Sequence, residues 1–207
     1  EIFFSASGVV NAADPRAAFA PGTLATIYGT GFAQGGVNAQ VKVNDVEARV
    51  AAVLQFQLSF EIPRSIPPGD ATLTVYSDLG TLSQPLTIQP LAPAAFRSGT
   101  GARGAVLNAD GSANTPYNPA IRGRAISILA TGLGETTAGN SPQTVIPITI
   151  LVNGREVAGA LARPAAGLIG VYQISLTLPA SIPPGNSVEI IILQQDTESI
   201  PVEISVE

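Results

Sequence analysis

The sequence predicts an all-β protein made of two tandem immunoglobulin-like β-sandwich domains with almost no helix. Short runs rich in Val, Ile, Leu and Thr recur between turn residues at the spacing of sandwich strands. No window longer than about ten residues keeps a 3.6-residue apolar period with helix caps, so helix should be scarce. A long stretch of the first half also recurs, in the same order, in the second half.

The expected strands are separated by 21 Gly and 17 Pro residues that are spread evenly along the chain, as turn residues are. Alternation of apolar and polar residues over 200–206 predicts a half-buried final strand, and Pro201 places that strand at a sheet edge. The other strand-like runs are 24–28, 41–43, 71–76, 126–129, 148–152 and 188–193.

The internal repeat is clearest at 57–69, which matches 173–185 at eight of thirteen positions. Upstream, 27–32 aligns with 128–133, at an offset of 101 residues, against an offset of 116 for the longer match. Because the offset grows along the chain while the order is kept, the second copy must carry loop insertions.

The two copies define two domains that meet near Pro90. Domain 1 is expected to span 1–90, with an extra N-terminal strand segment at 1–7, and domain 2 to span 91–207. The short, Pro-containing joint at 89–93 should hold them as a semi-rigid tandem. Five arginines are expected to gather around this joint, some of them bridging the domains: Arg16, Arg97, Arg103, Arg122 and Arg124.

Each domain contains the same two kinds of predicted turn. The Asn-Asp pair at 44–45 and the Asn-Gly pair at 153–154 accept the positive φ that type I′ hairpins require. The Ile-Pro-Pro-Gly runs at 66–69 and 182–185 predict rigid reversals, because Pro fixes φ and Gly accepts the strained position.

Ordered motifs carry a family resemblance. The runs VVNAA, APGTL and IYGTGF at 9–13, 20–24 and 27–32 are followed by further motifs at 92–96, 104–114, 118–123 and 130–134. From about residue 8 onward the chain resembles the uncharacterised C-terminal repeat domain of secreted acidobacterial (Solibacter-type) proteins. The resemblance implies two immunoglobulin-like modules of the IPT/TIG kind in a secreted or surface-attached protein, with no established activity or catalytic residues.

The composition excludes most enzyme chemistry. The chain has no Cys, His, Met or Trp, so thiolate nucleophiles, imidazole bases and the usual zinc ligands are absent. The remaining route to hydrolysis is a pair of facing carboxylates, and the nearby acid pairs at 45/47 and 196/198 fall in predicted hairpin turns. We therefore expect a protein that is not an enzyme and needs no cofactor.

The charge pattern also limits the partners. Only 12% of residues are charged, the net charge is −5, and the basic residues are scattered, which argues against nucleic-acid binding. No apolar run reaches the 18 residues of a membrane span. The chain begins at Glu1 with neither an initiator Met nor a basic-then-apolar leader, as a processed mature protein or an excised fragment would. A secreted or cell-surface location is expected.

A weak candidate for calcium binding surrounds Gly111. An EF-hand register would place Val106 and Tyr117 at two ligand positions, so the EF-hand interpretation fails, and an Asp-Gly hairpin turn is the plainer interpretation. The oxygen-bearing side chains of this candidate site are Asn108, Asp110, Ser112 and Asn114.

The first functional hypothesis is a structural surface protein that assembles with its own copies into a filament. Open sheet edges are usually protected by charge, especially Lys, and Lys42 is the only lysine. The apolar residues Ile2, Phe3 and Phe4 precede the first module and form a candidate assembly strand that adds to a neighbouring sandwich. The alternative is that these three residues pair within domain 1.

The second hypothesis is an adhesion or binding module of a larger secreted protein. The insertion at 132–143 is the candidate recognition loop for a surface glycan or another protein, because rigid scaffolds often display function on insertions. Its plainer interpretation is a disordered connector.

Overall fold

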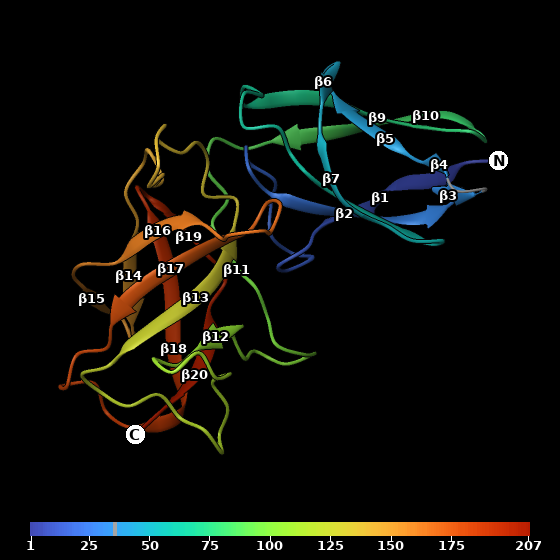
Figure 1. Cartoon of the computed structure of the whole chain (residues 1–207). Helices are drawn as coiled ribbons and strands as arrows, with labels where there is room; N and C mark the ends of the chain where they lie inside the picture. Colours follow the sequence, from blue (N-terminus) through green and yellow to red (C-terminus); the bar gives the residue numbers. More distant parts are fainter. Residues whose placement is uncertain (35–36) are drawn as a thin grey trace.

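A computed structural model of the chain describes residues 1–34 and 37–207. It is an all-β protein of two tandem immunoglobulin-like sandwiches that lie at an angle to one another (Figure 1). Throughout the described residues there is no helix, and hence none of the length and apolarity that a membrane crossing requires.

Strands β1 to β10 form domain 1. One sheet has the order β1-β2-β8-β7 and the other the order β10-β9-β5-β6, while β3 and β4 form a separate short pair. The strand bounds are β1 Phe3–Asn11, β2 Leu24–Thr30, β3 Ala33–Gln34, β4 Val37–Asn38, β5 Gln40–Val43, β6 Val46–Glu47, β7 Arg49–Val53, β8 Gln57–Glu61, β9 Gly69–Ser77 and β10 Gly80–Ile88.

Strands β11 to β20 form domain 2. One sheet has the order β11-β13-β17-β16, with β12 also paired to β13, and the other has the order β15-β14-β18-β19, with β20 also paired to β18. The strand bounds are β11 Ala94–Ala95, β12 Val106–Leu107, β13 Ala125–Thr131, β14 Thr149–Val152, β15 Arg155–Val157, β16 Leu161–Pro164, β17 Tyr172–Thr177, β18 Gly185–Gln194, β19 Thr197–Glu198 and β20 Val202–Val206.

Each domain has its own hydrophobic core. The core of domain 1 draws on buried residues from Ile2 to Ile88, and the core of domain 2 on residues from Ala95 to Val206. The two cores share no residue. Pro90, where the sequence places the domain boundary, lies in the stretch between them.

The predicted turns and the repeat are visible in the backbone. Asn44, Asp45, Asn153 and Gly154 all have positive φ, from 46° to 73°, which confirms the two hairpin turns. The stretches just before β2 and just before β13 also make equivalent backbone hydrogen bonds in the two domains. Gly22 N–H donates to the Ile62 carbonyl at 2.9 Å, and Gly123 N–H donates to the Leu178 carbonyl at 2.7 Å.

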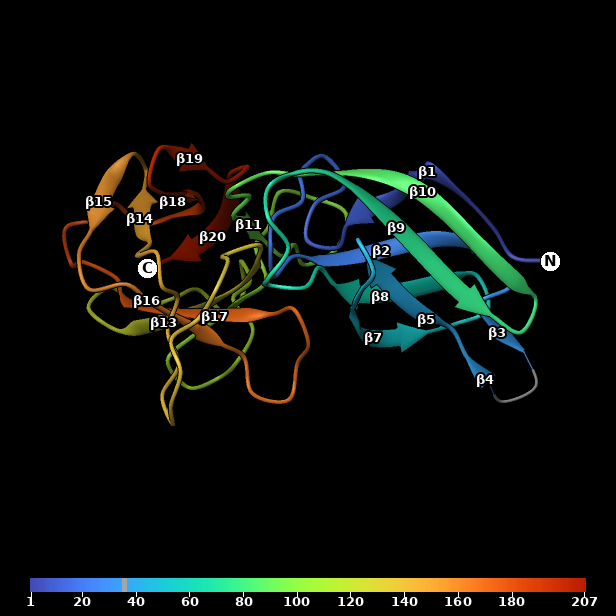
Figure 2. The same ribbon diagram turned by 90° about the horizontal axis from the view of Figure 1, so that it is seen from above.

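The N-terminal segment, residues 1–4, pairs within domain 1. Phe3 and Phe4 lie opposite Thr30 and Gly29 of β2, and Figure 2 shows that the N-terminus lies at the end of domain 1 farthest from domain 2. Ile2 and Phe4 are buried, whereas Phe3 is 67% exposed. In this structure the segment therefore closes the end of its own sandwich.

A bulge separates this segment from the rest of β1. The pairing register jumps from Phe4 opposite Gly29 to Val9 opposite Ile27, so residues 5–8 face a single residue of β2. The Gln84 side chain donates to the Phe4 carbonyl at 2.9 Å, and the Phe4 and Phe32 rings lie 6.2 Å apart. The segment is thus bonded to domain 1 on the far side of a bulge of small residues within β1.

Replacing Phe4 should destabilise domain 1 strongly, because its ring is 1% exposed and fills the core. We expect Phe4→Ala to lower the free energy of unfolding by about 3–5 kcal/mol. The neighbouring Phe3→Ala removes an exposed ring and should change it by less than about 0.5 kcal/mol. Urea denaturation of dilute protein measures both values. Equal effects of the two substitutions would contradict this burial pattern.

Candidate functional site

The joint between the domains is built around the hydroxyl of Thr131, the last residue of β13. The Leu24 N–H of domain 1 donates to Thr131 Oγ1 at 2.7 Å, and Thr131 Oγ1 donates to the Gly170 carbonyl at 2.6 Å. Thr131 is fully buried. One side-chain hydroxyl therefore connects the start of β2 in domain 1 with the loop that precedes β17 in domain 2.

Tyr172 lies beside this hydroxyl and packs under domain 1. Its hydroxyl donates to the Gly134 carbonyl, and burial raises the pKa of Tyr172 to about 12, so the phenol stays protonated as a donor. A Cβ on Gly22 would collide with the Tyr172 hydroxyl, so domain 1 approaches this closely only because residue 22 is glycine.

Arg64 of domain 1 extends the joint on one side. Its guanidinium lies 5.2 Å from the centre of the Tyr172 ring, and its Nη1 donates to Thr136 of domain 2 at 2.9 Å. Its Nε pairs at 2.7 Å with Glu61, a buried carboxylate that also accepts from Arg49 at 3.1 Å. The buried charge of Glu61 is therefore matched by two arginines, one of which reaches across the joint.

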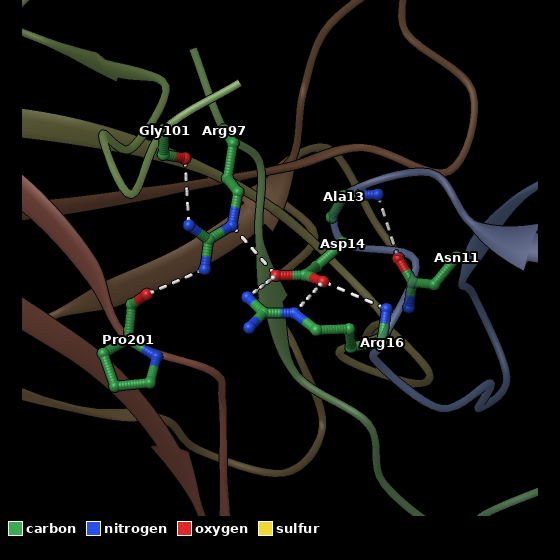
Figure 3. Close-up of polar contacts among 7 residues, drawn as sticks. All are labelled: Asn11, Ala13, Asp14, Arg16, Arg97, Gly101 and Pro201. Carbon is green, nitrogen blue, oxygen red and sulfur yellow. Dashed lines mark hydrogen bonds and ion pairs between the residues drawn. The ribbon is translucent and has the colours of Figure 1, made fainter. Parts of the chain in front are cut away.

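Asp14 holds the other side of the joint (Figure 3). This carboxylate is 3% exposed and pairs with Arg16 at 2.8 Å and with Arg97 of the second half at 2.9 Å. Hydrogen bonds from Arg16, together with that from Arg97, hold the pKa of Asp14 well below its usual range. Arg97 also donates to the carbonyls of Gly101 and Pro201, so it links domain 1 to two loops of domain 2.

The prediction that five arginines gather at the joint is right for Arg16 and Arg97 and wrong for Arg103, Arg122 and Arg124. Arg103 donates to Ser205 and to the Asn186 carbonyl within domain 2, and Arg122 donates to the Glu207 carbonyl. Arg122 and Arg124 lie before the first residue of β13, whereas the joint is reached only by its last residue, Thr131. The two arginines are therefore at the opposite end of this strand from the joint.

Two hollows flank the joint. One measures about 540 Å³ and is lined by apolar residues together with a polar group of side chains that includes Arg16, Gln89, Asp196, Thr197 and Glu198. The other measures about 320 Å³ and lies between the Pro-rich turn of domain 1 and residues of domain 2, including Pro68, Leu91, Glu135 and Ile146.

The tip of domain 1, its end away from the joint, exposes an apolar surface. This surface comprises Phe3, Tyr28, Leu54, Phe56 and Leu79, which are between 38% and 67% exposed. A hollow of about 430 Å³ lies there, lined by Thr30, Gly31, Ala33, Gln55, Phe56 and Leu79. In the segments that form the tip (1–4, 28–34, 53–57 and 77–80), Glu1 and Asp78 are the only charged residues.

The candidate calcium ligands lie close together around one turn, and their side chains bond partly to one another and partly to Asn118 and Ser205. Asp110 accepts from the Ser112 N–H at 2.9 Å and from its hydroxyl at 2.5 Å, and these bonds lower the pKa of Asp110. Asn114 donates to Asn108 at 3.1 Å and accepts from the Ser205 N–H at 2.8 Å. Across residues 1–34 and 37–207, no three acidic side chains gather as metal ligands would. Calcium binding at this turn stays a prediction.

The insertion at 132–143 lies at the joint. Its Thr137 N–H donates to the Gln143 carbonyl at 2.8 Å, and Thr136 forms a bridge with Thr144, so the segment is a hydrogen-bonded hairpin. Its exposed end comprises residues 137–141. The contact between Arg64 and Thr136 ties this hairpin to domain 1.

Comparison with known proteins gives only distant likenesses. No family model matches the chain, and no curated protein matches it. Among solved structures, the chain is similar to SGBP-B of the Bacteroides ovatus mixed-linkage glucan utilisation locus, in complex with a mixed-linkage heptasaccharide, at 15% identity and a TM-score of 0.35 over 82% of this chain and 37% of that one.

Two further likenesses are of the same kind. The I9–I11 tandem of titin matches at 13% identity and a TM-score of 0.27, over 99% of this chain and 65% of that one. The BSP domain of a biofilm associated protein matches at 13% identity and a TM-score of 0.31, over 92% of this chain and 28% of that one. The chain thus spans less than two thirds of each of these structures, and the likenesses are too distant to transfer a function.

Removing the charge of Asp14 should lower the free energy of unfolding at neutral pH. It should also make that free energy fall less steeply as the pH is lowered. Because the folded pKa is depressed, the stability that Asp14 contributes is complete above its unfolded pKa of about 3.9 and is lost as the pH falls below that value. We expect Asp14→Asn to lower the free energy of unfolding by about 1–3 kcal/mol at pH 7.

The same substitution should have a smaller effect near pH 2, because Asp14 of the unfolded chain is protonated there and unfolding gains the free energy of that proton uptake. Denaturant unfolding at pH 7, 4 and 2 measures this, with the exposed Asp70→Asn as the matched control. An Asp14→Asn effect that is equally large at pH 7 and pH 2 would contradict the assignment.

Proposed function

We propose that this protein is a non-enzymatic extracellular structural protein that associates with further copies of itself through the tip of domain 1. The observation that carries this proposal is the exposed apolar tip, where Phe3, Tyr28 and Phe56 are each more than half exposed. Soluble monomers rarely expose large contiguous apolar patches, and such patches usually mark interaction sites. The exposed apolar residues of the tip therefore support its use as a protein contact.

The low charge of the chain supports association with identical copies. With 12% charged residues and a net charge of −5, two copies repel each other weakly at physiological salt. The edge strand β10 has no charged residue over Gly80–Ile88, and its protection consists of Pro85 near its centre. The chain therefore carries little of the charge that normally keeps sandwiches apart.

A location outside the cell and the absence of catalysis belong to the same proposal. A chain without cysteine is indifferent to an oxidising environment. Its buried acids, Asp14 and Glu61, are already paired with arginines at the joint, which suits a mechanical role better than proton transfer.

One route to association is exchange of the N-terminal segment, as a donor strand. The segment carries two apolar anchors, Ile2 and Phe4, behind the bulge at residues 5–8, so it can leave its own sandwich without unpairing the rest of β1. A second copy would then offer the same place beside its Thr30.

The double variant Phe3→Cys/Thr30→Cys tests this route. These two residues lie directly opposite each other, at a spacing that suits a disulfide, and the chain has no other cysteine. We expect wild-type protein to show a concentration-dependent mass above 21.1 kDa by sedimentation and light scattering, with long particles in electron micrographs.

The same double variant, oxidised and reduced, provides its own control. Both forms lack the Phe3 and Thr30 side chains, so the comparison between them isolates exchange: if exchange is the route, the reduced form assembles at a lower concentration than the oxidised form. If both forms assemble at the same concentration, the tip is used without strand exchange. If wild-type protein stays a monomer at millimolar concentration, the proposed function itself is wrong.

A second candidate function is recognition of a glycan at the joint. The hollow of about 540 Å³ favours it, because its amide, hydroxyl and carboxylate groups suit a polyol and because ligand sites often lie between domains. Titration calorimetry with a mixed-linkage heptasaccharide tests this. Binding that is lost in Asp196→Ala supports the idea, and no heat at millimolar ligand counts against it.

A further inference from the structure

The tip of domain 1 corresponds, residue by residue, to the surface of domain 2 that is covered in the joint. The repeat aligns Thr30 with Thr131 and Gly31 with Gly132. Gly29 N–H donates to the Phe56 carbonyl, and Ala130 lies opposite Tyr172, so Phe56 is the counterpart of Tyr172. Both surfaces are thus built from the end of one strand and the start of its neighbour.

The two surfaces differ mainly in what covers them. Thr131 and Tyr172 are fully buried because domain 1 lies on them, whereas Thr30 is exposed and Phe56 is 58% exposed. The hollow of about 430 Å³ at the tip is lined by Thr30, Gly31 and Phe56 themselves. The tip of domain 1 is therefore the exposed counterpart of the domain 2 surface that domain 1 covers in the joint.

The surface that would cover the tip also exists in the chain. In the joint, residues 21–24 of domain 1 lie against domain 2, with Gly22 at Tyr172 and Leu24 at Gly170. The repeat aligns 21–24 with 122–125, and Gly22 and Gly123 share a positive φ of 82° and 78°. Residues 121–125 are exposed, and a Cβ on Gly123 would meet nothing within 4 Å.

We propose that residues 122–125 of one copy dock on the tip of domain 1 of a second copy, in the way that residues 21–24 dock on domain 2 within the chain. This inference rests on the proposed function that copies associate through the tip, and it names the partner surface. The contact is heterologous, since each copy contributes a different surface. Repetition of such a contact generates an open-ended fibre or a ring, instead of a dimer of two copies.

The docking segment 122–125 and the tip segments carry side-chain charges of opposite sign, and Arg122 also donates to the Glu207 carbonyl at 3.1 Å. Residues 122–125 include Arg122 and Arg124, while the charged residues of the tip segments are Glu1 and Asp78. Complementary charge steers association and fixes its register.

The contact between copies should be weaker than the joint within the chain. The counterpart of Arg64, which packs over Tyr172 in the joint, is Ala180 in the repeat. The contact between copies therefore lacks this cation, as well as the covalent linkage that holds the two domains of one chain close together. Assembly should accordingly depend on concentration and reverse on dilution.

One substitution at each end tests the pairing. Phe56→Ala removes the aromatic anchor of the tip, and Ala125→Glu places a charge at the counterpart of Leu24. Each should raise the concentration at which half of the copies are associated by about tenfold or more. The matched controls are Phe56→Tyr, which copies Tyr172, and Ala138→Glu on the exposed hairpin, and both should assemble as wild type does.

Mixing the two variants gives the decisive result. At the wild-type assembly concentration each variant alone should be a monomer, and an equimolar mixture should form pairs of twice 21.1 kDa that do not grow further. The pairs form because the intact end of the Phe56→Ala copy meets the intact tip of the Ala125→Glu copy. Thermal unfolding confirms that each variant is folded.

Other outcomes separate this inference from the proposed function. If Ala125→Glu assembles like wild type while Phe56→Ala does not, the tip binds a different surface and the inference is overturned, although self-association stands. If neither substitution changes assembly, the tip is not the contact. If wild-type protein never associates, both proposals fail.

Discussion

The relative placement of the two sandwiches depends on the close contact between Gly22 of domain 1 and Tyr172 of domain 2. A side chain at residue 22 would displace the tyrosine, and with it the Gly134 carbonyl that accepts from the tyrosine hydroxyl. The same approach brings the Leu24 N–H within 2.7 Å of the Thr131 hydroxyl. Because these groups are backbone atoms or short side chains, the contact tolerates little movement, and the tip of domain 1 is held facing away from domain 2.

Charge is concentrated where this contact needs support. The two buried carboxylates, Asp14 and Glu61, each pair with two arginines, and both lie at the joint. A buried carboxylate is costly unless it is paired and hydrogen-bonded, which accounts for four of the nine arginines. In a chain with few charges, this use leaves the tip of domain 1 almost uncharged. The paired charges at the joint and the nearly uncharged tip are therefore two aspects of how the few charged side chains are distributed along the chain.

The fold was predictable because its signals are local. Positive φ at Asn44 and Asn153 follows from the residue types alone, and the repeat fixes which strands correspond. Arg16 and Arg97 were predicted at the joint, but the role of Thr131 was not predictable, because Thr30 and Thr131 are identical residues in aligned positions and differ only in what lies over them. Arg64 was missed for a related reason, since its role depends on Tyr172, more than a hundred residues away. The departures from the repeat, Arg64 for Ala180 and Tyr172 for Phe56, were the signals in the sequence that could have indicated the joint.

A tandem that repeats one fold also repeats the surfaces through which its units meet. Repeat proteins normally end in units whose outer faces are polar, because the terminal faces would otherwise bind further copies. The outer faces of the two described units keep the backbone features through which the units meet, although Arg122 and Arg124 stand where the first copy has Pro21 and Thr23. The N-terminal segment closes the core of domain 1 with Ile2 and Phe4 yet leaves Phe56 exposed, and the opposite end keeps a glycine, Gly123, in the same backbone conformation as Gly22. Exposed faces that share the backbone conformation of the joint and carry opposite charges are what docking between two copies requires.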